Sequence, residues 1–212
     1  MATVPFKAGL QRLRQARADV VKSASVEAVH ALRVACARLR VWAWVVKQRQ
    51  LTDELRWLRA SAGHVRDLDL QPRRASVRDQ RAKVEQHLID TLKSRRALKL
   101  LRELSSVSPV ARRKAKRRIR KLVRDLLSDE PNWQRMGEVH RFRRVVRRVR
   151  YGLEWLGQPT RQLVLVQDAL GLAHDLALTQ RSRAVKRRID EQVALARRCW
   201  RRLRPGLARW AE

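Results

Sequence analysis

The sequence predicts an all-α fold. Its 212 residues include only 7 Gly and 6 Pro, so turn-forming residues are scarce. The β-branched residues are scattered and do not alternate with polar residues as they do in strands. With 44% apolar residues, the chain can bury the core of one large helical domain or of two small ones that share a core. We therefore expect a single helical domain over residues 1–212.

The apolar periodicity divides the chain into helical segments, and the prolines mark where it breaks. Helices are expected at 7–22, 25–48, 51–62, 65–71, 76–105, 109–128, 136–157, 160–180 and 183–204. Loops or first helical turns are expected at the prolines, which are Pro5, Pro72, Pro109, Pro131, Pro159 and Pro205. Ser25 is a suitable N-cap for the second helix because its hydroxyl can accept a hydrogen bond from the first turn.

The second helix has two distinct faces at about 100° per residue. The apolar face consists of Leu32, Ala35, Cys36, Leu39, Trp42, Ala43 and Val46. His30, Arg33 and Arg40 fall together on another face. The helix is therefore expected to pack on one side and to present a His/Arg row on another. Trp44 falls on this second face, whereas core packing is expected for Trp42, Trp57 and Trp200.

Two blocks of sequence occur twice, in the same order. VHALRVACARLR, residues 29–40, aligns with VHRFRRVVRRVR, residues 139–150, at a shift of 110 residues. AGHVRDLDL, residues 62–70, aligns with LGLAHDLAL, residues 170–178, at a shift of 108 residues. A repeat of about 106 residues is longer than a solenoid unit, which has roughly 20–50 residues. We therefore expect two related helical bundles, a first half at 7–105 and a second at 109–205.

The charge of the chain favours a polyanionic partner. The 51 Lys and Arg against 20 Asp and Glu leave a formal charge of +31, which is self-repulsive without a polyanion. An arginine row alone is usually a solvated face, but here a histidine recurs in register with the arginines in both halves. The candidate binding residues are His30, Arg33, Arg40, His140, Arg143, Arg147 and Arg150. Nearer the apolar face lie two secondary candidates, Arg38 and Arg148.

The paired blocks resemble the CHAD family, the conserved histidine α-helical domain, and the resemblance extends over residues 7 to 205. It implies two four-helix bundles around a positively charged central channel, binding of inorganic polyphosphate, and association with polyphosphate granules. It places the family's histidines on His30 and His140, and its channel arginines on Arg33, Arg40, Arg143 and Arg150. Ala37 departs from the family, which often has a basic residue there, whereas the second half keeps Arg147. We therefore expect the second-half helix to contribute more of the binding.

Two alternatives stay open at this point. The histidines can be direct phosphate ligands or structural side chains that bond a neighbouring carbonyl. The basic segment 111–124 is typical of non-specific RNA or DNA backbone binding, although no helix-turn-helix spacing, RNP-like aromatics or zinc-finger ligands accompany it. The same segment also has an apolar stripe typical of a core helix, made of Ala115, Ile119, Leu122, Val123 and Leu126.

Enzymatic activity is not expected. The sequence has neither a GxxxxGK motif nor a cluster of closely paired acidic residues. CHAD modules are often fused to a triphosphate-tunnel domain with alternating Glu and Lys on its strands, and the chain has no such segment. Asp67, Asp69 and Asp175 are expected to pair with arginines and to fix helix ends.

The remaining patterns predict a cytoplasmic protein without a metal or cofactor. Cys36 and Cys199 lack zinc-ligand spacing and are expected to be reduced thiols. The N-terminal residues lack the apolar run of a signal peptide. No stretch approaches the roughly 20 apolar residues of a membrane span.

Overall fold

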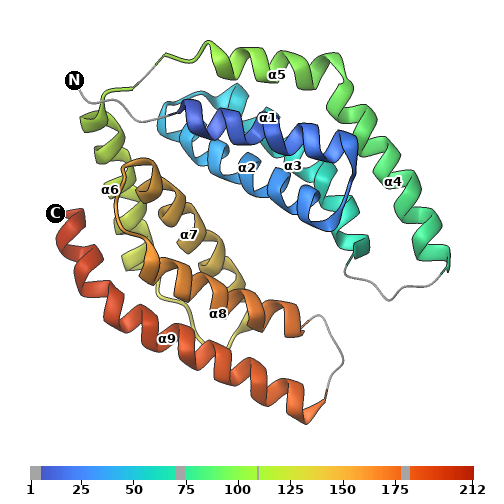
Figure 1. The fold of residues 1–212 in the computed structure, drawn as a ribbon. Helices are drawn as coiled ribbons and strands as arrows, with labels where there is room; N and C mark the ends of the chain where they lie inside the picture. Colours follow the sequence, from blue (N-terminus) through green and yellow to red (C-terminus); the bar gives the residue numbers. More distant parts are fainter. Residues whose placement is uncertain (1–5, 70–74, 109, 178–181) are drawn as a thin grey trace. The chain divides into compact units, whose positions relative to one another are not determined.

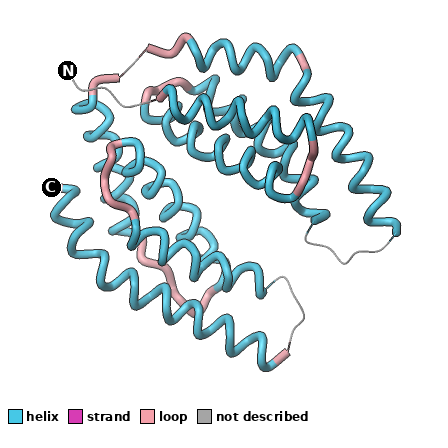
Figure 2. Tube along the Cα trace, in the orientation of Figure 1, coloured by secondary structure: helices cyan, strands magenta, loops and turns pink. Residues whose placement is uncertain are grey.

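The structure is a computed structural model that describes residues 6–69, 75–108, 110–177 and 182–212. These residues form nine helices and no strand, which confirms the all-α class (Figure 1; Figure 2). None of these helices is long and apolar enough to cross a membrane. The helices are α1 (Lys7–Lys22), α2 (Val26–Val45), α3 (Arg49–Asp69), α4 (Ala75–Lys93), α5 (Arg95–Ser105), α6 (Arg112–Ser128), α7 (Met136–Trp155), α8 (Arg161–Ala177) and α9 (Arg183–Ala211).

The chain divides into two compact units, Met1–Ala111 and Arg112–Glu212, called here the first and the second unit. In the first unit, α2 packs against α1 and α3, and α4 and α5 pack against α1 and α3. The apolar residues that repeat at helical spacing are the buried ones, and their burial drives the packing. The fully buried side chains include Leu13, Leu32, Leu39, Leu55, Leu58, Leu100 and Leu104.

Two predicted helix boundaries in the first unit are wrong. The helix expected over 76–105 is interrupted at Ser94, whose extended backbone separates α4 from α5. The Ser94 hydroxyl accepts from the backbone N–H of Ala97 at 3.2 Å and donates to the carbonyl of Thr91 at 2.7 Å, so this side chain replaces helical backbone bonds. Conversely, the break expected near residues 63–64 does not occur, because the buried stripe of α3 continues through Gly63 to Val65 and Leu68.

The α4 helix is held mainly by polar contacts. Its buried residues are Leu88 and Leu92, both in its last two turns. Nearer its start, the Arg81 guanidinium donates to Asp69 of α3 at 2.8 Å and to the Ala24 carbonyl at 2.8 Å, and it also pairs with Glu85. Asp69 thus pairs with an arginine, as the sequence predicts. Arg81 fixes the first half of α4 where apolar burial does not.

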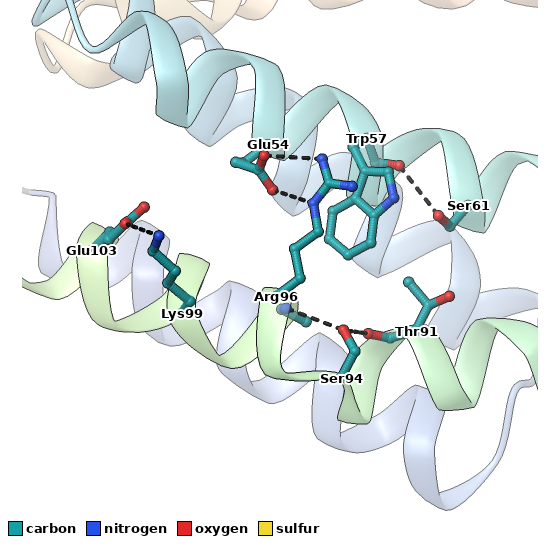
Figure 3. A network of polar contacts seen from close by, with 9 residues as sticks. Glu54, Trp57, Ser61, Thr91, Ser94, Arg96, Lys99 and Glu103 are labelled. Carbon is teal, nitrogen blue, oxygen red and sulfur yellow. Dashed lines mark hydrogen bonds and ion pairs between the residues drawn. The ribbon is translucent and has the colours of Figure 1, made fainter.

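The α5 helix is attached to α3 through Arg96 (Figure 3). Its Nε and Nη2 donate to the two oxygens of Glu54 at 2.7 and 2.9 Å, and its guanidinium lies 4.0 Å from the ring centre of Trp57. Trp57 is therefore half-buried beneath a cation, and the prediction that it packs in the core is wrong. A ring with one free face suits this position because its π surface attracts the guanidinium. Trp42 and Trp200 are buried, as predicted.

In the second unit, α7 packs against α6 and α8, and α9 packs against α8 and α6. Phe142 of α7 meets Trp200 of α9 edge-on, with ring centres 5.1 Å apart, and it meets Trp133 edge-on at 5.4 Å. These edge-to-face contacts are the favoured geometry for buried aromatic rings. The four helices enclose one apolar core, in which the predicted stripe of α6 is buried: Ala115, Ile119, Leu122, Val123 and Leu126.

Pro205 lies inside α9, so the prediction that this helix ends near residue 204 is wrong. Proline has no N–H to donate to the carbonyl of Arg201, four residues earlier. Both residues are exposed, so water can satisfy that carbonyl. Leu207 and Ala211 beyond the proline are buried, and their burial keeps the last turns helical. Pro131 and Pro159 lie outside the helices as predicted, whereas Pro5, Pro72 and Pro109 are outside the described residues.

Replacing Pro205 by Ala is expected to raise the free energy of unfolding by about 1–3 kcal/mol. Alanine is about 3 kcal/mol more favourable than proline within a helix, and the greater entropy of the unfolded variant offsets part of the gain. Urea denaturation followed by circular dichroism measures the change. P159A, in the loop between α7 and α8, is the matched control and should gain nothing. A less stable P205A would show that α9 needs the fixed φ angle of the proline.

Candidate functional site

The His/Arg row of α2 lies beside its buried face. The Ser25 hydroxyl caps the helix by accepting from the Ala28 N–H at 3.2 Å, as predicted. This cap starts the helix one turn before His30, which is exposed, and Arg33 follows on the same side, half-buried. Arg38 and Arg40 are also half-buried. The side chains that α2 turns into the core include Val29, Leu32, Cys36 and Leu39.

Arg33 lies against the backbone of α3 at Gly63. A Cβ added to Gly63 would stand 3.0 Å from the Arg33 Nη1, so the guanidinium occupies the space that a side chain would fill. Burial, followed by the nearby charge of Arg59 and opposed by Asp67, lowers the pKa of the Arg33 guanidinium. Arg66 adds a third cation. This α2/α3 face therefore concentrates positive charge that a single carboxylate offsets only in part.

The same contact occurs in the second unit. A Cβ added to Gly171 of α8 would stand 3.2 Å from the Nη2 of Arg143 on α7. Arg143 and Gly171 occupy the positions that Arg33 and Gly63 occupy in the repeated blocks. The two blocks that recur in the sequence thus meet in each unit, through an arginine that lies over a glycine. This contact explains why the second block has a glycine at that position in both halves: a larger residue would collide with the guanidinium.

His140 of α7 lies beside His174 of α8 on this α7/α8 face. Their ring centres are 4.5 Å apart and their planes are tilted by 40°. The Nδ1 of His140 is buried and has no hydrogen-bond partner among the described residues. Burial, followed by His174 and three arginines of α7, lowers the pKa of His140. Burial and Arg143, opposed by Asp175, lower the pKa of His174.

His174 is not among the residues selected from the sequence, although a signal for it was present. It stands in the second block of the repeat, where it aligns with Arg66 of the first half. A comparison of the two blocks position by position would have shown a histidine where the other half has an arginine. The contact between His174 and His140 could not be predicted from the sequence, because the repeat does not specify which side chains meet across two helices.

The remaining candidates differ in their surroundings. Arg147 is half-buried and Arg148 is exposed. The Arg150 guanidinium donates to Glu154 at 2.8 Å and to Gln167 of α8 at 3.2 Å, which anchors it on the α7/α8 face. In α2, Ala37 occupies the position that corresponds to Arg147, and it is buried. The halves therefore share the arginine over glycine and differ in the charges around it.

Metal chemistry has no evident site in the described residues. No group of three or more His, Cys, Asp or Glu side chains gathers there with a geometry that could hold an ion. Burial raises the pKa of the Cys36 thiol to about 12, so this cysteine stays protonated and unreactive. The chemistry of the faces is that of arginine and imidazole, which bind anions through N–H donors.

These features define an all-helical, strongly basic protein with a repeated pair of helices. The CHAD domain model matches residues 6–184, most of the chain, and the protein belongs to the CHAD domain family. The fold resembles the crystal structure of the CHAD domain from the plant Ricinus communis, with a TM-score of 0.64 and 19% identity over 89% of this chain and 83% of that chain. It also resembles PptA from Streptomyces chartreusis, with a TM-score of 0.54 and 15% identity over 99% of both chains. A search of curated proteins finds no match.

Because the pKa values of His140 and His174 are lowered in the folded protein, we expect the free energy of unfolding to decrease as the pH decreases below about 6.5. The folded protein keeps His140 and His174 neutral below their ordinary pKa of 6.5, whereas the unfolded chain takes up protons there. Their contribution is complete above about pH 6.5 and is lost as the pH falls through the folded pKa values. Thermal unfolding at pH 7.5 and 5 should therefore show a smaller loss of Tm for H140Q/H174Q than for the unaltered protein. If both proteins lost the same amount of Tm, residues other than His140 and His174 would be responsible for the loss of stability at low pH.

Proposed function

We propose that this protein binds linear inorganic polyphosphate through its α2/α3 and α7/α8 faces. The observation that supports the proposal is the repeated arginine over glycine, which holds a guanidinium in the same place in both units. Membership in the CHAD family supports it as well. An association with cytoplasmic polyphosphate granules follows from this function. The placement of both faces in a common channel stays a prediction.

Arginine is suited to this ligand. Polyphosphate repeats one anionic group without bases to be read, so a receptor needs many donors and no sequence code. The planar guanidinium can donate two parallel hydrogen bonds to phosphate oxygens and stays charged at any physiological pH. On the α2/α3 face, Arg33, Arg59 and Arg66 repel one another. A bound phosphate chain would relieve that repulsion and would release its own counterions.

The two faces reach their positive charge by different routes. The second unit has Arg147 on α7, where the first has the buried Ala37. The first unit has Arg59 and Arg66 on α3, where α8 has Gln167 and His174. We therefore propose that α7 contributes more than α2, as the sequence predicts, and that α3 contributes more than α8.

Replacing Arg143, Arg147 and Arg150 by Ala is expected to weaken polyphosphate binding at least tenfold in roughly 0.1 M salt. Each lost phosphate contact should also make the dependence of log affinity on log salt shallower by roughly 0.7. Fluorescence anisotropy with a labelled long chain, at several salt concentrations, measures both effects. Circular dichroism checks that the variant is folded, because Arg150 also anchors Glu154.

A triple variant on α6, R113A/R117A/R124A, is the matched control. It removes the same formal charge from three exposed arginines that lie on the opposite side of α6 from its buried stripe. Its polyphosphate affinity should fall much less. If both triple variants weaken binding equally, total charge and not the α7/α8 face determines affinity. If the α7 variant binds normally, the proposed face is wrong.

The basic outer face of α6 supports a second candidate function, non-specific binding of the RNA or DNA backbone. This helix has nine Lys and Arg and a single acidic residue, Asp125. Its apolar stripe is buried in the second unit, and the basic side chains exposed to solvent include Arg113, Arg117, Lys121 and Arg124. In the first unit the exposed Trp44 offers a ring on which a base can stack. If nucleic acid were the ligand, the α6 variant would lose more affinity for single-stranded RNA than the α7 variant, and polyphosphate would not displace that RNA.

We also propose that the bound chain is not cut. Incubation of long-chain polyphosphate with the protein and Mg²⁺ is expected to leave the chain length unchanged on a polyacrylamide gel. Neither face has an assembled metal site among the described residues, and phosphoanhydride cleavage generally uses a metal ion to stabilise the developing charge. Shortened chains in the sample, absent with the R143A/R147A/R150A variant, would make the protein an enzyme.

A further inference from the structure

Alignment of the two repeated blocks shows one position where the units differ in charge: Arg66 in the first unit and His174 in the second. On the α2/α3 face, the block that follows Gly63 places Arg66 three residues later. On the α7/α8 face, the equivalent residue after Gly171 is His174, and its ring lies 4.5 Å from that of His140. The first face therefore has a permanent cation where the second has an imidazole, whose charge depends on the pH.

The surroundings of the histidine pair oppose its protonation while no anion is present. The charges that act on the two rings come from α7 and α8: Arg143, Arg144, Arg147 and Asp175. Of the other helices of this unit, α6 and α9 add no charge that acts on either ring in the described residues. Three cations against one carboxylate, together with partial burial, favour neutral imidazoles. Two imidazoliums at this separation would also repel each other.

A bound phosphate chain reverses each of these effects. Its oxygens bring negative charge next to the arginines and accept hydrogen bonds from protonated ring nitrogens. The Nδ1 of His140 is buried and has no partner among the described residues, so a proton on this ring is poorly compensated until a negative charge is bound nearby. Binding of the anion and uptake of protons therefore favour each other, as linkage requires.

We infer that polyphosphate binding at the α7/α8 face is coupled to proton uptake by the His140/His174 pair, so that this face binds the chain more tightly as the pH falls. At the α2/α3 face, Arg66 supplies that charge at every pH. The inference rests on the proposed function and adds a pH response to one of its two faces. His174 becomes a binding residue in addition to those selected from the sequence.

The test compares the protein with H174Q and H174R. Isothermal titration calorimetry with long-chain polyphosphate, at constant ionic strength from pH 8 to 5.5, gives the affinities. Buffers of different ionisation enthalpy give the number of protons taken up. A long chain is used because its internal phosphates stay singly charged over this range, whereas end groups titrate near pH 6. A pKa raised by about one unit on binding corresponds to about a tenfold gain in affinity across the range.

We expect this gain, with proton uptake, for the unaltered protein. H174Q should lose about half of the gain and about half of the proton uptake, because His140 remains and His174 can no longer take up a proton. H174R, which reproduces the charge of Arg66, should bind more tightly than the unaltered protein at pH 8 and should show little pH dependence. H87Q, which removes an exposed histidine of α4, is the control and should behave like the unaltered protein.

The outcomes separate the two proposals. If polyphosphate binds but H174Q keeps the pH dependence and the proton uptake, the coupling is wrong and the proposed function stands. If H174R shows the same pH dependence as the unaltered protein, the coupling is also wrong, and this result does not depend on the behaviour of glutamine. If polyphosphate binds at no pH, the proposed function falls and the inference falls with it.

Discussion

In each unit, an arginine of one helix occupies the space left by a glycine of the next, and the placement of positive charge depends on this contact. A methyl group at Gly63 or Gly171 would stand within 3.0 or 3.2 Å of the guanidinium and would push it outward. Neither glycine is needed to form a turn, since both lie within continuous helices. It fixes a cation beside the helix backbone, close to the core, where an ion on a flexible side chain would otherwise point into water.

The apolar cores make this concentration of charge possible. The first unit has 23 Lys and Arg against 10 Asp and Glu, and the second has 28 against 10, so both units fold against their own repulsion. Buried leucines, together with Phe142 and Trp200, supply the opposing free energy. The α2/α3 and α7/α8 pairs each bury an apolar stripe, so the differences in charge between their exposed faces are not needed for packing. These differences in charge can therefore serve the binding properties of each face.

Much of the fold could be predicted because helical periodicity is a local property. The ends of α1 and the cap at Ser25 follow from a few neighbouring residues, and the all-α class follows from the scarcity of Gly and Pro. The failures have tertiary causes. At Ser94 a hydroxyl competes with the backbone, and beyond Pro205 the burial of Leu207 outweighs the propensity of a single proline. Trp57 fits a core pattern but meets Arg96 from another helix.

The candidate faces could be predicted in part. The repeat identified Arg33 and Arg143, and their spacing placed them beside the apolar stripes. The contributions of the neighbouring helices could not be predicted. Arg59 and Arg66 of α3 and His174 of α8 join the faces through contacts that only the packed structure defines. Alignment of the two halves indicates which positions correspond, but it does not indicate which side chains touch.

The sparse burial of α4 has a consequence for how the first unit moves. Its first 13 residues contain no buried side chain, and the Arg81 guanidinium in this segment donates to Asp69 at the end of α3 and to the Ala24 carbonyl. Amide hydrogens in such a segment exchange through local opening, whereas those of α2 and α3 exchange only when the core unfolds. We therefore expect α1, α2, α3 and α5 to form the stable body of the first unit, from which the first part of α4 can detach and return without loss of the α2/α3 face.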